Sequence, residues 1–155
     1  MKLKRLVINL ILILNIILIT FAMPTLAHEV KMEDKKIEKI VNLRMKNMST
    51  ISSLSKKIYK DINSKDFESL NKNLLELQHN ALEFKNSFPE GSMGGKSKKI
   101  IWDEKDLFNE YADNFLKDIN LLIEDNQSQN LEALNVSFGK MTSNCGTCHK
   151  KFKSK

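Results

Sequence analysis

Residues that interrupt regular structure are scarce in this sequence. It holds five glycines and two prolines in 155 residues, and three of the glycines fall between Phe88 and Lys98 together with Pro89. No segment alternates apolar and polar residues over a sustained length, and clusters of β-branched residues are short, which argues against strands. We therefore expect an all-helical protein with one substantial break near its middle.

Other absences narrow the range of functions. No basic stripe with interleaved aromatic residues is present, so we expect no nucleic acid partner. No nucleophilic side chain has a plausible base beside it in the pattern, so we do not expect an enzyme, and in particular neither a hydrolase nor a transferase. Lysines and acidic residues are interspersed, which is typical of solvated helix faces.

The first 27 residues have the composition of a secretory signal. Three basic residues come first, an apolar run covers residues 6 to about 23, and the small residues Thr25 and Ala27 end the segment. We expect residues 1–27 to be a cleaved signal peptide and residues 28–155 to form one periplasmic domain. Cleavage leaves 22 basic against 19 acidic residues, because the segment holds three of the 25 basic ones. The alternative is an uncleaved membrane anchor, since the run overlaps the lower limit for a spanning helix.

Four apolar stripes with helical spacing follow the signal. They predict helices over residues 32–60, 65–87, 103–125 and 131 onward, with a loop over residues 88–99. Helices of this length joined by short links favour an antiparallel up-down-up-down four-helix bundle.

Local signals refine these helices. Met45 and Met48 both fall on the apolar stripe of the first helix. Residues 61–64 are expected to interrupt the chain, with Ser64 as the N-cap of the second helix. Asp103 and Asp106, three residues apart, resemble a capping arrangement at the start of the third.

The only two cysteines lie on the last apolar stripe. Its members are separated by alternating steps of three and four residues: Leu131, Leu134, Phe138, Met141, Cys145, Cys148 and Phe152. Both thiols therefore share the core-facing side of the helix. Whatever they hold is expected to sit inside the bundle.

Cys145, Gly146, Thr147, Cys148 and His149 form a pentapeptide of the type that attaches c-type haem. Two thiols on one helix face can add to the two vinyl groups of a haem, while the adjacent imidazole is placed to ligate the iron. We expect one covalent haem c near the C-terminus, held by Cys145 and Cys148, with His149 as an axial iron ligand.

A redox dithiol, a zinc site and a disulfide are the alternatives to haem attachment at this pentapeptide. A redox dithiol needs a βαβ context, which the chain lacks. A zinc site needs two further ligands, and only His28 and His79 remain. A disulfide between residues three apart in a helix is strained, although an exported chain meets an oxidising compartment.

Three patches of the chain resemble the cytochrome c′ family. The stretch from Cys145 to Lys153 resembles the family's ending, in which the haem motif closes the last helix of a four-helix bundle. Residues 44–48 resemble its first-helix pattern, and residues 88–92, followed by Ile101 and Trp102, resemble its loop between the second and third helices. The similarity covers nearly all of the chain after the signal.

The resemblance implies roles for individual residues. Cys145 and Cys148 would bear the thioethers, and His149 would be the proximal ligand, with Lys153 beside its imidazole on the same helix face. Arg44 would lie near a haem propionate. Met45 and Ser92 would lie near the haem edge, and Met48 would lie over the distal face.

Met48 decides between two kinds of cytochrome. If it only crowds the iron, the resemblance implies a five-coordinate haem that reversibly binds nitric oxide or carbon monoxide. If its sulfur ligates the iron, the protein is a low-spin carrier of the cytochrome c-556 type. Family members often pair through their first two helices, which implies a homodimer.

We therefore expect an exported c-type cytochrome that acts in one-electron transfer with a redox partner protein, in binding of a diatomic gas, or in both. Contact with a membrane is expected only if the N-terminal segment is retained. The alternative from another class is a haem-free helical module that binds a metal or acts as an adaptor.

Overall fold

Helices account for the regular structure of residues 2–155, apart from one isolated bridge. The computed structural model describes residues 33–155 in full and, for residues 2–32, only the helical backbone. Two units are distinguished, residues 1–37 and residues 38–155. The signal peptide predicted for residues 1–27 lies outside the residues whose side chains are described. Among the helices of residues 33–155, none has the length and apolar character that a membrane span requires.

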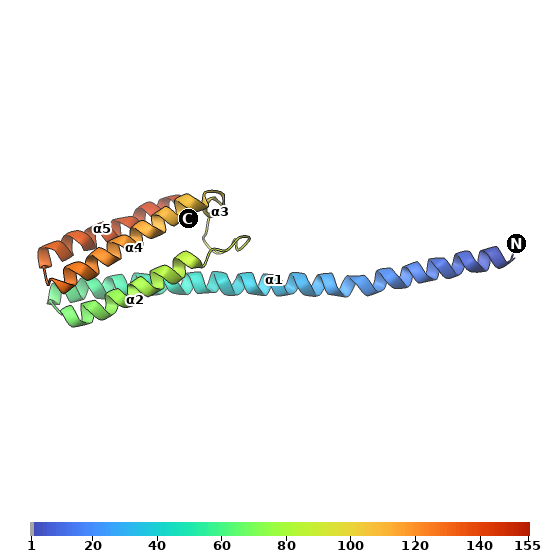
Figure 1. Ribbon diagram of the computed structural model, residues 1–155, viewed down its shortest axis with the longest axis horizontal. Coiled ribbons are helices and arrows are strands. Elements are labelled where there is room, and N and C mark those ends of the chain that lie inside the picture. The colour runs from blue at the N-terminus through green and yellow to red at the C-terminus, as the bar shows by residue number, and fades with distance from the viewer. Residues whose placement is uncertain (1) are drawn as a thin grey trace. The chain divides into compact units, whose positions relative to one another are not determined.

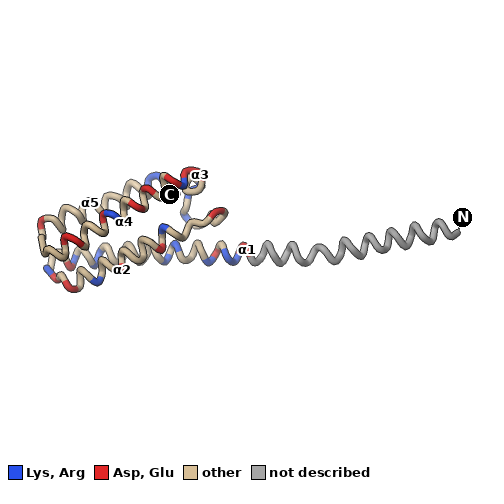
Figure 2. The backbone as a smooth tube through the Cα atoms, in the orientation of Figure 1, with Lys and Arg blue, Asp and Glu red and all other residues tan. Residues whose placement is uncertain are grey.

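The elements are α1 (Lys2–Ser64), α2 (Phe67–Asn86), α3 (Ile100–Asp103), α4 (Lys105–Gln127) and α5 (Leu131–Phe152). In residues 38–155, the end of α1 and helices α2, α4 and α5 run in alternating directions as a bundle (Figure 1). The predicted all-α four-helix fold is thus confirmed, and the short α3 is an addition that the apolar spacing did not indicate. Acidic and basic residues are interspersed along the described helices (Figure 2).

The buried face of α1 differs from the predicted one. Arg44 and Asn47 are buried, in line with Ile51 and the aliphatic residues that follow, whereas Met45 is 60% exposed. The assignment of Met45 to the core stripe is therefore wrong. Successive residues of a helix are turned by about 100°, so a face that passes through positions 44, 47 and 51 points residue 45 toward solvent.

The link between α1 and α2 is shorter than predicted. Helix α1 continues through residues 61–64, and Ile62 within them is buried. The chain turns at Lys65, whose φ is 59°, and Asp66 is the N-cap, because its side chain accepts a hydrogen bond of 3.0 Å from the Ser69 amide. The predictions of a break at residues 61–64 and of a Ser64 cap are wrong, since the carboxylate of Asp66 satisfies an amide of the first turn.

The start of α4 also differs from the prediction. Asp103 ends α3 and forms an ion pair with Lys99, and Glu104 caps α4 without a side-chain hydrogen bond. Asp103 and Asp106 therefore form no capping arrangement. Burial of Ile101 in an aromatic cluster holds residues 100–103 in their own helical turn, which places the start of α4 after Asp103.

Two apolar clusters fill the bundle. The larger one combines aliphatic side chains of α1, α2, α4 and α5, such as Leu54, Leu74 and Leu122, and each such fully buried side chain contributes about 1.5–3 kcal/mol. The smaller one is aromatic and contains Phe88, Ile101, Phe108 and Phe152, with Cys148 packed against it. The cysteine motif therefore lies at the aromatic end of the bundle.

The loop before α3 is joined to the C-terminus of the chain. The Lys98 amide donates to the Phe152 carbonyl at 3.0 Å, the Ser154 amide donates to the Lys96 carbonyl at 2.9 Å, and Ser97 and Lys153 form an isolated bridge. These bonds fix the end of α5, and with it the turn that carries His149.

Candidate cofactor site

A pocket lies between four helices where α5 carries the two cysteines. It holds about 560 Å³ of space free of atoms, part of it open to solvent. Its walls come from every long helix: Met48 and Ile51 of α1, Ala81 and Phe84 of α2, Phe108, Tyr111, Ala112 and Phe115 of α4, and Asn144, Cys145, Cys148 and His149 of α5. The structure thus brings together four of the residues that the sequence assigned to one site.

Cys145 and Cys148 are free thiols and half-buried. Burial raises the pKa of Cys145, and burial, followed by the charge of Cys145, raises the pKa of Cys148 to about 11. Both groups are therefore neutral thiols at pH 7. In residues 33–155, no three His, Cys, Asp or Glu side chains are grouped to hold a metal ion.

His149 is half-buried on the next position of α5. Burial lowers its pKa, and the nearby charge of Lys153 lowers it further. The imidazole is therefore neutral at pH 7, with a nitrogen lone pair that can bind iron. These three donors fit a covalently attached haem with a histidine ligand.

Lys153 is placed differently from the prediction. Helix α5 ends at Phe152, and Lys153 is its extended C-cap residue, with an exposed side chain. The premise that Lys153 continues the helix face of His149 is therefore wrong. It nevertheless stays close, because its backbone amide donates to the His149 carbonyl at 3.1 Å and its charge lowers the pKa of the imidazole.

Arg44 is a charged residue buried in the bundle, with 4% of its surface exposed. Its Nη2 donates to the Ser92 carbonyl, and its guanidinium carbon lies 4.6 Å from the centre of the Phe88 ring and 5.7 Å from that of Trp102. Among the residues whose side chains are described, none is a hydrogen-bond partner of Nε or Nη1, and burial lowers the pKa of the group. A buried cation with two free donors is costly unless it meets an anion, so this side chain fits a carboxylate such as a haem propionate.

The other two predicted residues take different places. Ser92 is buried, and its hydroxyl donates to the Pro89 carbonyl at 2.8 Å, so it shapes the loop that receives Arg44. Met45 lies on the solvent side of α1 and is not among the residues that line the pocket. Ser92 is therefore hydrogen-bonded to Arg44, whereas Met45 lies outside the pocket.

Sequence reasoning missed two polar residues at the site. Lys105 donates to the Phe88 carbonyl at 2.9 Å and lies 5.2 Å from the centre of the Phe108 ring, so it is a second cation beside Arg44. Asn144 lines the pocket directly before Cys145. Its spacing of four residues from Cys148 could have indicated this position, whereas no local signal placed Lys105.

Comparison with known proteins identifies the family. A family model described as cytochrome C′ matches residues 39–153. The fold is similar to the nitric oxide complex of a variant of cytochrome c prime from Alcaligenes xylosoxidans, with a TM-score of 0.72 and 20% identity over 77% of this chain and 96% of that chain. A reduced variant from the same organism gives a TM-score of 0.72 and 20% identity over 77% and 97% of the two chains. No curated protein sequence matches the chain. Since the family model spans most of its length, the chain belongs to the cytochrome c′ family, whose members carry covalently bound haem c.

Proposed function

We propose that this protein is an exported c-type cytochrome with one haem c, whose iron reversibly binds nitric oxide or carbon monoxide, exchanges one electron with a partner protein, or does both. The observation that carries this proposal is the pocket in which Cys145, Cys148 and His149 meet an apolar wall that includes Met48. We also propose that the protein turns over no substrate.

Different residues of the chain would attach the haem, ligate its iron and pair with its propionate. Cys145 and Cys148 would hold the haem through thioethers, and neutral His149 would ligate the iron. Arg44 would pair with a propionate, since a guanidinium offers several donors to a carboxylate. When bound, the haem supplies an iron that changes between two oxidation states and can take a neutral diatomic ligand.

The remaining wall of the pocket favours a gas ligand. Ile51, Ala81 and Phe84 present apolar surface, and the aromatic residues of α4 complete it. Apolar side chains such as these offer no hydrogen bond to water and stabilise no charge, so they favour neutral diatomic molecules over polar ligands. The similar structures from Alcaligenes xylosoxidans include nitric oxide complexes, which supports the same ligand class here.

Absorption spectra of the purified ferric and ferrous protein test the proposal. A five-coordinate high-spin spectrum, with covalent haem retained after denaturation, is expected. Loss of all haem on denaturation would instead favour the haem-free metal-binding or adaptor module.

The alternative is a low-spin electron carrier of the cytochrome c-556 type, in which Met48 would ligate the iron. Met48 supports this alternative because it is half-buried and lines the pocket. If its sulfur ligates the iron, Met48→Ala converts a low-spin spectrum to a high-spin one and lowers the midpoint potential. If it only crowds the iron, the coordination number stays the same and carbon monoxide binds faster. Met45→Ala is the matched control, since this methionine of the same helix lies outside the pocket.

Export and assembly complete the proposal. Mass spectrometry of the periplasmic protein is expected to show a chain that begins at His28, and retention of Met1 in a membrane fraction would contradict cleavage. A homodimer through α1 and α2 is supported by five large apolar side chains exposed there, Leu43, Met45, Tyr59, Leu75 and Leu82. Sedimentation velocity would separate the dimer from the monomer.

A further inference from the structure

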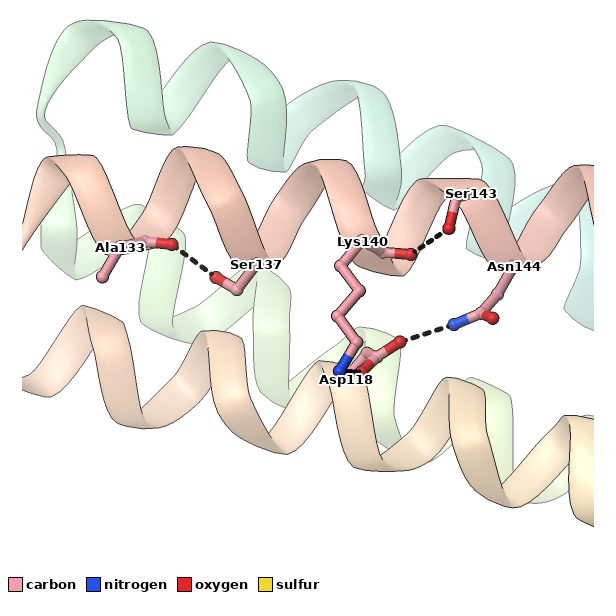
Figure 3. Close-up of polar contacts among 6 residues, drawn as sticks. All are labelled: Asp118, Ala133, Ser137, Lys140, Ser143 and Asn144. Carbon is pink, nitrogen blue, oxygen red and sulfur yellow. Dashed lines mark hydrogen bonds and ion pairs between the residues drawn. The ribbon is translucent and has the colours of Figure 1, made fainter.

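A carboxylate lies buried between α4 and α5, and neither haem attachment nor iron ligation uses it. Asp118 of α4 has 4% of its surface exposed. Its Oδ1 lies 3.0 Å from Lys140 Nζ, and its Oδ2 accepts a hydrogen bond of 2.6 Å from Asn144 Nδ2 (Figure 3). Both oxygens therefore have partners on α5.

The neighbouring hydroxyl groups do not share in this arrangement. Ser137 donates to the Ala133 carbonyl at 2.9 Å, and Ser143 donates to the Lys140 carbonyl at 2.7 Å, both within α5 (Figure 3). The contacts that Asp118 makes thus come from two side chains one helical turn apart. These two contacts hold the turn of α5 that precedes the cysteine motif against α4.

Asn144 connects the carboxylate to the pocket. It lines the pocket wall and directly precedes Cys145. Since its amide nitrogen is engaged by Asp118, the orientation of its side chain is set from α4. The negative charge therefore lies one hydrogen bond from the pocket wall.

The two charges of the ion pair are in different surroundings. The side chain of Lys140 is 58% exposed, whereas that of Asp118 is 6% exposed. Water screens an exposed charge far better than a buried one. The pocket therefore experiences the negative charge of Asp118 more strongly than the positive charge of Lys140.

We propose that Asp118 is a positioning residue of the haem site that also sets its reduction potential. It fixes Asn144 at the pocket wall, and its buried negative charge favours the oxidised iron, which carries one more positive charge than the reduced iron. This inference rests on the proposed function, because it requires a covalently attached haem.

Spectroelectrochemical titration of the haem-loaded protein tests this role. Asp118→Asn keeps the shape of the side chain and removes its charge, so the midpoint potential is expected to shift upward. Lys140→Gln removes the compensating charge, so the potential is expected to shift downward, by less than Asp118→Asn shifts it upward because water screens the exposed Lys140. Asp113→Asn, at an exposed carboxylate of α4 paired with Lys85, is the control and is expected to leave the potential unchanged.

The opposite signs distinguish charge from structure. Both variants break the same ion pair, so a purely structural role would lower the unfolding midpoint in each and move the two potentials together or not at all. That result, obtained with haem content equal to that of the wild type, would overturn the proposal. If Asp118→Asn does not fold, Lys140→Gln decides alone: a lower potential supports the proposal and an unchanged one overturns it. A wild-type protein without covalent haem would remove the proposed function as well.

Discussion

Phe152, the last residue of α5, allows a quantitative test of how the end of the bundle is held. Its side chain is 3% exposed and meets the rings of Phe108 and Tyr111 edge to face, at 5.4 and 5.3 Å between centres. Both of these rings line the pocket. Truncation of a buried phenylalanine to alanine costs about 3–5 kcal/mol, to which each aromatic pair contributes about 0.5–1.5 kcal/mol.

We expect Phe152→Ala to destabilise the haem-loaded protein by about 3 kcal/mol, the lower end of that range, because the end of a helix can partly collapse into the space left behind. With a urea slope of about 1–3 kcal/mol per molar, the midpoint falls by roughly 1–3 M. Phe152→Leu is the control: it keeps most of the apolar burial and loses only the ring pairs, so it should cost about 1–2 kcal/mol.

The assay is urea unfolding followed by far-UV circular dichroism, with the absorption spectrum recorded in parallel. The reasoning would be refuted if both variants unfolded within about 0.5 M of the wild type, a difference of about 0.5–1.5 kcal/mol at the slopes above. Such a result would mean that the end of α5 frays without affecting the aromatic cluster.

Three further predictions concern the loop, a helix cap and the thiols. Gly94→Ala should destabilise the protein more than Gly91→Ala in urea unfolding. Both glycines have positive φ, but of the two only Gly94 would place an added Cβ 2.8 Å from a methyl carbon of Val41. Val41→Ala should therefore restore part of the stability that Gly94→Ala removes. Asp66→Ala should lower the free energy of unfolding at pH 7. Because the Ser69 amide holds the pKa of Asp66 below its ordinary value, this loss should fade as the pH falls through the lowered pKa. A loss that does not change with pH would contradict the role of Asp66 as a cap. In the haem-free chain, once circular dichroism has shown that it is folded, alkylation of Cys148 should accelerate up to pH about 11, and mass spectrometry should detect no plateau near pH about 8.5.

The end of the chain was predictable because its pattern is purely apolar. Steps of three and four residues place Leu134 and Met141 in the core, and both are fully buried. The same steps carry Cys145 and Cys148 to the pocket wall. Periodicity is reliable here because burial of apolar surface alone determines which face turns inward.

The first helix shows where periodicity fails. Its pattern favoured Met45 for the core, yet Arg44 is buried instead. The burial of Arg44 depends on the Ser92 carbonyl, 48 residues away, and on the Phe88 ring. A local rule that counts apolar side chains cannot detect partners that come from a distant loop.

Arg44 and Asp118 are the buried charged residues of the described bundle. Arg44 lies over the Phe88 ring, which packs against the pocket residue Phe108, and Asp118 is bonded to Asn144 of the pocket wall. Replacing a buried ion pair by well-packed apolar residues is often neutral or stabilises a protein by about 1–4 kcal/mol. An apolar residue could therefore replace Asp118 of the pair with Lys140 at little cost in stability, and burial of Arg44, with Nε and Nη1 unpartnered among the described side chains, is itself costly. Local rules are broken mostly at functional sites, so the two charges are better explained by the group that the pocket holds than by the fold.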